Sequence, residues 1–132
     1  MVENNRFVVD ASFVLSILLP DEKTKIQARR YLNLILDPKN KIISTNLLEF
    51  EVGNGLRSAF LRKRIKKDSL KVLSNNFKLL PIVLNKIHFD NTLMFAVDEI
   101  LSYYDATYVY LARKLKSRLL TLDEKLLKLA EK

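Results

Sequence analysis

The stretch Phe7-Val8-Val9-Asp10 decides how the rest of the chain is interpreted. Its three apolar residues form a short run without polar alternation, which is typical of a strand buried on both faces of a parallel sheet. Asp10 stops the run, so it directly follows the carboxyl end of that strand. Ligands of parallel sheets bind in the crevice beyond the carboxyl ends of the strands, and Asp10 is therefore the first candidate for a functional residue.

Strands and helices are expected to alternate along the whole chain. Short apolar runs predict strands over 7–9, 42–44, 79–84 and 118–122. Helical periodicity predicts helices between these strands, including one over 88–102, and a last helix after the fourth strand. This order predicts an α/β fold, with a central parallel sheet between two helical layers.

Polar residues and prolines mark the expected helix ends. Ser12 is a suitable cap for the first helix, which Pro20 ends. Asp21 and Glu22 open the second helix. Thr45 or Asn46 is expected to cap the third, which carries an amphipathic stripe over 48–60.

Length and composition narrow the class of protein. With 132 residues the chain is one domain, 1–132, and a net charge of +8 suits a polyanionic partner, although many small proteins are simply basic. Without Cys there is no disulfide, thiolate site or cysteine nucleophile, and the two glycines lie outside any phosphate-binding loop. No apolar stretch approaches the roughly 18 residues of a membrane span, and we expect a soluble, cytoplasmic protein.

Four acids are expected at one edge of the sheet. Asp10 and Asp123 follow the first and fourth strands, and Asp105 stands at a helix start. Glu51 lies in the second turn of the helix that leaves the second strand, beside its apolar stripe. Glu49 is about 200° away around that helix, so Glu51 is the residue expected to face the edge.

Each acid also has a plainer interpretation. Asp105 and Asp123 could each be a helix N-cap, Asp10 a turn residue and Glu51 a solvated helix residue. Converging carboxylates, in contrast, repel one another and call for a cation. Oxygen ligands without His or Cys suit Mg²⁺ or Mn²⁺, which can lower the pKa of a bound water and stabilise charge on a phosphodiester.

Four segments around these acids resemble the successive motifs of PIN-domain nucleases, most closely the VapC toxins of prokaryotic toxin–antitoxin pairs. They are Val8-Val9-Asp10-Ala11-Ser12, Glu51-Val52-Gly53-Asn54-Gly55-Leu56, Ser102-Tyr103-Tyr104-Asp105-Ala106 and Leu120-Thr121-Leu122-Asp123. Each motif alone is weak, whereas the ordered set, which spans nearly the whole chain, is fairly specific.

The resemblance implies a PIN-like α/β/α sandwich with a parallel sheet of four or five strands. The family usually adds a fifth strand after the fourth acid, and here only residues 124–132 follow Asp123. It implies a Mg²⁺- or Mn²⁺-dependent endoribonuclease that cuts RNA, forms a homodimer and is inhibited by a VapB-like antitoxin. By position, Asp10, Glu51, Asp105 and Asp123 match the metal-binding and catalytic acids. Ser12 and Asn54 match the supporting hydroxyl and amide residues.

Basic and aromatic residues are further candidates. A basic run could track an RNA backbone, could bind an antitoxin, or could be an ordinary solvated face; it comprises Arg57, Arg62, Lys63, Arg64, Lys66 and Lys67. His88 is interpreted as a structural residue, and Tyr103, Tyr104, Tyr108 and Tyr110 as core or dimer-interface residues.

Two rival functions remain at this point. A non-catalytic PIN-like module that binds RNA or protein would share the fold. A receiver-type signalling domain would also hold Mg²⁺, but it needs an acceptor Asp after the third strand, where Asn85-Lys86 stands here.

Overall fold

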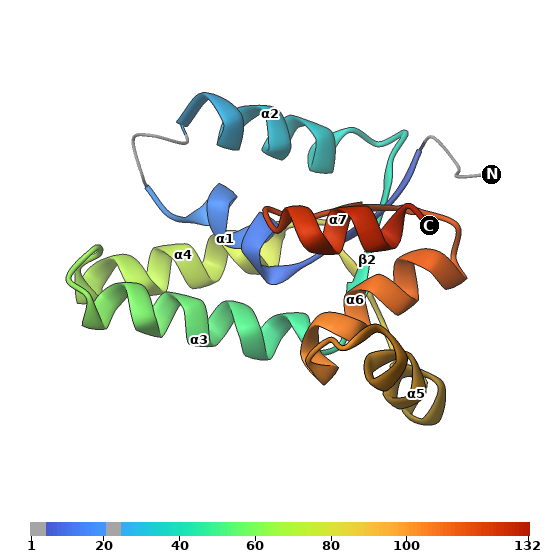
Figure 1. Cartoon of the computed structure of the whole chain (residues 1–132). Coiled ribbons are helices and arrows are strands. Elements are labelled where there is room, and N and C mark those ends of the chain that lie inside the picture. The colour runs from blue at the N-terminus through green and yellow to red at the C-terminus, as the bar shows by residue number, and fades with distance from the viewer. Residues whose placement is uncertain (1–4, 21–24) are drawn as a thin grey trace.

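The computed structural model describes residues 5–20 and 25–132 (Figure 1). Its strands are β1 (Arg6–Val9), β2 (Lys41–Thr45), β3 (Val83–Asn85) and β4 (Arg118–Leu120). Its helices are α1 (Ala11–Leu18), α2 (Lys25–Leu36), α3 (Leu48–Leu61), α4 (Lys67–Leu79), α5 (Phe89–Glu99), α6 (Tyr103–Lys114) and α7 (Glu124–Ala130). The expected opening of the second helix at Asp21 and Glu22 lies outside the described residues.

The strands form one parallel sheet in the order β3-β2-β1-β4. β1 is central, with Phe7 opposite Ile42 of β2 and Arg118 of β4. Val8 and Val9 are both fully buried although their side chains point to opposite faces, so helices cover the sheet on both sides. The predicted α/β fold is confirmed. Across the described residues the sheet has four strands, and the chain after Asp123 forms α7 instead of a fifth.

Two groups of helices surround the sheet. α6 packs on β1, β2 and β4, and α5 and α7 pack against α6. α1 packs against α2 and α3, while α3 and α4 lie side by side as an antiparallel pair, green in Figure 1. This arrangement leaves the carboxyl end of β1 between the starts of α1, α3 and α6.

The expected third strand was placed too early. α4 continues to Leu79, and β3 begins only at Val83, after Pro81. Pro81 has no amide hydrogen to donate to the neighbouring strand, so β3 can pair with β2 only after this residue. The fourth strand is shorter than expected and ends at Leu120 instead of Leu122. The helix expected over 88–102 ends at Glu99, because the next residue, Ile100, takes a left-handed conformation with φ of 55°.

Two expected helix caps were also wrong. Asp10, not Ser12, caps α1, because α1 begins directly after β1 and the Asp10 carboxylate accepts a hydrogen bond from the Phe13 amide. Leu47 occupies the cap position of α3 without a side-chain bond. The amide of Asn46 instead donates to the carbonyl of Asn85, so residue 46 still belongs to the sheet edge.

None of the helices within the described ranges is long and apolar enough to cross a lipid bilayer.

Candidate active site

Asp10 stands at the junction of β1 and α1, where its side chain is 5% exposed. One carboxylate oxygen accepts from the Phe13 amide at 3.0 Å and from Ser12 Oγ at 2.7 Å. The other accepts from Thr121 Oγ1. Burial raises the pKa of this carboxyl group, and the three hydrogen bonds oppose the rise without cancelling it. Asp10 is therefore a buried acid that is held in one orientation by uncharged donors.

Hydroxyl groups tie the end of β4 to the end of β1. Thr121 Oγ1, which donates to Asp10, accepts from the Asp123 amide at 3.1 Å. Ser12 Oγ accepts from the Leu122 amide at 3.0 Å. Because these bonds cross between the two strand ends, the position of Asp123 is linked to that of Asp10.

Glu51 lies in the first turn of α3, one turn earlier than expected because the helix begins at Leu48. Tyr108 of α6 donates from its hydroxyl to Glu51 Oε1 at 2.6 Å. Burial raises the pKa of Glu51; the Tyr108 bond lowers it, and the charges of Asp105 and Asp10 raise it further. Glu49, on the same helix, is exposed, so Glu51 is the residue that faces the acids.

Asp105 is the third residue of α6. It is not the helix cap, because Ser102 holds that position and accepts from the Asp105 amide at 3.0 Å. The Asp105 carboxylate also has a hydrogen bond with the side chain of Ser102. Burial raises its pKa, and the charges of Asp123 and Asp10 raise it further, while the Ser102 hydrogen bond and the charge of Lys125 lower it. Asp105 therefore faces the ends of β1 and β4.

Asp123 is the N-cap of α7, as one interpretation of the sequence had it. One carboxylate oxygen, Oδ1, accepts from the amides of Lys125 at 2.9 Å and Leu126 at 3.3 Å. Its side chain is exposed, and its charge raises the pKa values of both Asp10 and Asp105. Capping and membership of the acid group are thus compatible.

The four carboxylates come from four separate segments and influence one another through space. We call Asp10, Glu51, Asp105 and Asp123 the acid cluster. As they stand in the described part of the chain, no three acidic or histidine side chains converge closely enough to enclose a metal ion. What the structure does establish is a half-buried group of like charges at the carboxyl edge of the sheet.

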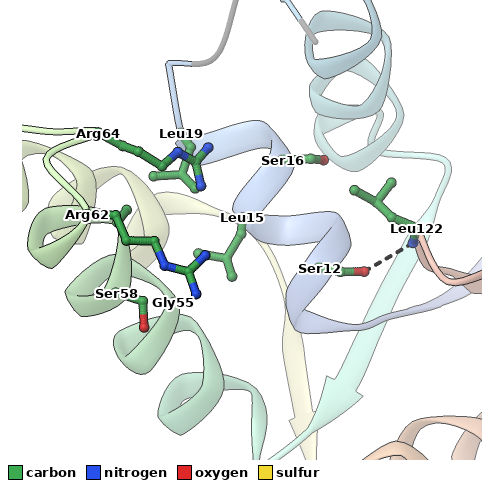
Figure 2. A pocket seen from close by; sticks show the side chains of 10 residues that line it. Ser12, Leu15, Ser16, Leu19, Gly55, Ser58, Arg62, Arg64 and Leu122 are labelled. Atoms are coloured by element: carbon green, nitrogen blue, oxygen red, sulfur yellow. Dashed lines mark hydrogen bonds between the residues drawn. The ribbon is translucent and has the colours of Figure 1, made fainter. Parts of the chain in front are cut away.

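The remaining candidates fall around this cluster. Asn54 is exposed on α3, one turn beyond Glu51. His88 is the N-cap of α5, where its Nδ1 accepts from the Asn91 amide at 3.4 Å. Arg62 and Arg64 line a cavity next to Ser12 (Figure 2). All six residues of the basic run are exposed: Arg57, Arg62, Lys63, Arg64, Lys66 and Lys67.

Sequence reasoning missed two residues of the site, Tyr108 and Thr121. Tyr108 is 1% exposed and was interpreted only as a core or interface residue. It follows Asp105 by three positions, which places both on one helix face and could have pointed to the site. Thr121 stands two residues before Asp123, and only the pairing of β4 with β1 reveals that its hydroxyl reaches Asp10.

Comparisons with known proteins identify the family and the fold. The sequence model of the PIN domain matches residues 7–132. The protein named Ribonuclease VapC3 from Pyrobaculum aerophilum is 30% identical over 125 residues, which are 92% of this chain and 92% of that protein. The crystal structure of PAE2754 from the same organism superposes with a TM-score of 0.73 at 21% identity, covering 94% of this chain and 78% of the other. The chain belongs to the PIN-domain family.

Proposed function

We propose that this protein is a Mg²⁺- or Mn²⁺-dependent endoribonuclease of the VapC type, which hydrolyses RNA phosphodiester bonds at the acid cluster. The observation that carries the proposal is the mutual electrostatic influence of carboxylates from four segments at the carboxyl edge of a parallel sheet. Its similarity to the protein named Ribonuclease VapC3 supports RNA as the substrate.

The donor atoms of the cluster, though not the present spacing of its side chains, suit a hard divalent cation. All four are oxygen donors, His88 is occupied as a helix cap, and the chain has no Cys. Three of the four carboxyl groups have raised pKa values, in part because they repel one another. A cation would remove that repulsion and favour the ionised forms.

The residues then have distinct roles. Asp10, Glu51 and Asp105 would hold the ion, and Asp123 would complete the site. When held by these carboxylates, such an ion would supply the positive charge that activates a water molecule and stabilises the charge developing on the phosphodiester. Ser12 and Thr121 fix the direction of the Asp10 oxygens, and Tyr108 fixes one oxygen of Glu51. These uncharged donors orient the acids without neutralising them.

An Asp10→Asn variant tests the assignment. Asn retains the cap of α1 and changes the side chain by one atom, so the fold is expected to persist. Cleavage of a mixed-sequence RNA is measured by gel electrophoresis in the presence of Mg²⁺ or Mn²⁺ and, separately, of chelator. The rate of metal-dependent cleavage by Asp10→Asn should be at least 100-fold below that of the wild type. This is the size of effect expected when a group that stabilises charge in the transition state is lost. Asp98→Asn, an exposed acid on α5, is the matched control. Full activity in Asp10→Asn, or equal loss in both variants, would refute the proposal.

We also propose that the protein acts as a toxin. As a VapC-type toxin the chain would be inhibited by a VapB-like antitoxin and would form a homodimer. Expression of the wild-type chain should then arrest bacterial growth, and Asp10→Asn should not. Light scattering of the purified protein measures the dimer directly. Growth arrest of equal strength by Asp10→Asn would favour the non-catalytic binding module instead.

A further inference from the structure

A cavity of about 340 Å³ lies between α1 and the C-terminal half of α3, beside the acid cluster. Figure 2 shows its lining side chains, with Arg62, the C-cap residue of α3, extending towards Leu15 of α1. Its polar lining includes the hydroxyls of Ser12, Ser16 and Ser58 and the guanidinium groups of Arg62 and Arg64. The volume falls in the range of small-ligand sites, about 300 to 1,000 Å³.

The cavity shares a wall with the acid cluster. Ser12 lines it and donates to Asp10 at 2.7 Å. Leu122 lines it too, and its amide donates to Ser12 directly before Asp123. A ligand that fills the cavity therefore lies next to Asp10 and Asp123, on the α1–α3 side of them.

The apolar side of the cavity depends on Gly55. A Cβ atom at residue 55 would lie 2.3 Å from Leu15 Cδ1, so only glycine leaves Leu15 in its present position. Leu15 and Leu19 then supply apolar side chains to the lining, from the same segment as Ser12 and Ser16. The cavity thus combines apolar contact, hydroxyl groups and positive charge within one nucleotide-sized space.

We infer that this cavity is a subsite for one nucleotide of single-stranded RNA, adjacent to the phosphodiester at the acid cluster. Arg62 binds the phosphate on the far side of that nucleotide, and its sugar or base packs on Leu15 and Leu19. Positive charge is needed there because the acid cluster repels a polyanion from its own side. The inference rests on the proposed function and identifies where the RNA strand continues.

Binding of RNA without cleavage tests the subsite separately from catalysis. The probe is a fluorescein-labelled single-stranded RNA of mixed sequence, in chelator, with affinity measured by anisotropy over a series of salt concentrations. Arg62→Ala should weaken binding about tenfold and reduce the slope of log affinity against log salt by about one. Ser58→Leu, which fills the cavity from a helical position, should weaken binding with an unchanged slope. Arg30→Ala removes the same charge from an exposed position on α2, outside the cavity lining, and should change affinity less than about twofold.

Cleavage kinetics supply the second readout. With metal present, Arg62→Ala should raise KM and leave kcat near that of the wild type, because Arg62 binds the strand and not the reacting phosphate. Wild-type protein that binds RNA with the expected variant pattern but does not cut it would overturn the proposed function and leave the subsite standing. Wild-type cleavage with equal RNA affinity in Arg62→Ala and Arg30→Ala would overturn the subsite alone.

A protein ligand is the other possible occupant of such a cavity. A labelled hexaglutamate peptide serves as the probe for acidic polypeptides. Loss of peptide binding in Arg62→Ala, with RNA affinity and KM unchanged, would assign the cavity to a protein and overturn the inference. Absence of RNA binding by the wild-type protein would overturn it as well.

Discussion

Replacing Tyr108 with Phe removes a single hydroxyl group from the edge of the acid cluster. The Tyr108 hydroxyl donates to Glu51 Oε1 at 2.6 Å, and the ring lies in the core at 1% exposure. Phe fills the same space, so the packing of α6 on the sheet should not change. The substitution therefore removes the hydrogen bond between α6 and Glu51 of α3, together with the bond between the same hydroxyl and the side chain of Thr45 on β2.

The size of the stability effect follows from the environment of that bond. A hydrogen bond to a charged group contributes about 1.5–3 kcal/mol, and Glu51 is only half-buried, so water partly replaces the lost donor. We expect a loss of about 1 kcal/mol in the free energy of unfolding. For a domain of this size that lowers the melting temperature by about 4 °C.

The effect on activity should depend on pH. The Tyr108 bond stabilises the ionised form of Glu51 and so lowers a pKa that burial has raised. Without the bond, the pKa of Glu51 rises further, and a higher pH is needed to ionise the carboxylate. The acidic limb of the kcat/KM profile should therefore move to higher pH in Tyr108→Phe, with activity recovering towards the wild-type level above it.

The assay measures kcat/KM for cleavage of a short RNA between pH 5 and 9 at saturating Mn²⁺. Tyr110→Phe is the control, because Tyr110 lies on the same helix and packs against Phe95 instead of an acid. Only Tyr108→Phe should shift the profile. A folded Tyr108→Phe protein with the wild-type acidic limb, or an equal shift in both variants, would refute the role of Tyr108 as a positioning residue.

Three further predictions concern stability. In the metal-free protein the raised pKa of Asp10 favours folding at low pH, and this contribution is lost as the pH rises through that pKa. Asp10→Asn removes the buried charge, so its melting temperature at pH 7.5 in chelator should be higher than that of the wild type. A melting temperature below that of the wild type would contradict this reasoning. Asp123→Ala should lower the free energy of unfolding by about 1 kcal/mol because α7 loses its N-cap. Asp123→Ser retains a capping hydroxyl, so it should keep the stability in thermal melts but lose activity in the cleavage assay. The two variants therefore separate the capping role of Asp123 from its role in the acid cluster. Gly53→Ala should stabilise the protein by about 0.5–1 kcal/mol, because no atom lies within 4 Å of a Cβ added at residue 53, whereas Gly55→Ala should destabilise it because the new Cβ crowds Leu15. Chemical denaturation measures both free energies of unfolding. If Gly55→Ala proved the more stable variant, the close packing of α1 against α3 at Leu15 would be wrong.

Much of the fold could be predicted because strand and helix periodicities are local properties. The run Phe7–Val9 identified the central strand, and the alternation of elements identified the parallel sheet. Element ends were less predictable. Ser12 and Asp10 are both good capping residues, and only the direct passage from β1 into α1 selected Asp10.

The sequence by itself determined the α/β class, the order of the four motifs and the choice of Glu51 over Glu49, because each depends on the period of one strand or helix. The tertiary structure decided which uncharged groups orient the acids. Tyr108 is 57 positions from Glu51, and Thr121 is 111 positions from Asp10. Hydrogen bonds over such separations form only when the helices and strands that carry them pack together, so no local pattern encodes them. The acids of this site can be recognised along the chain, but the donors that hold them in place are set by packing.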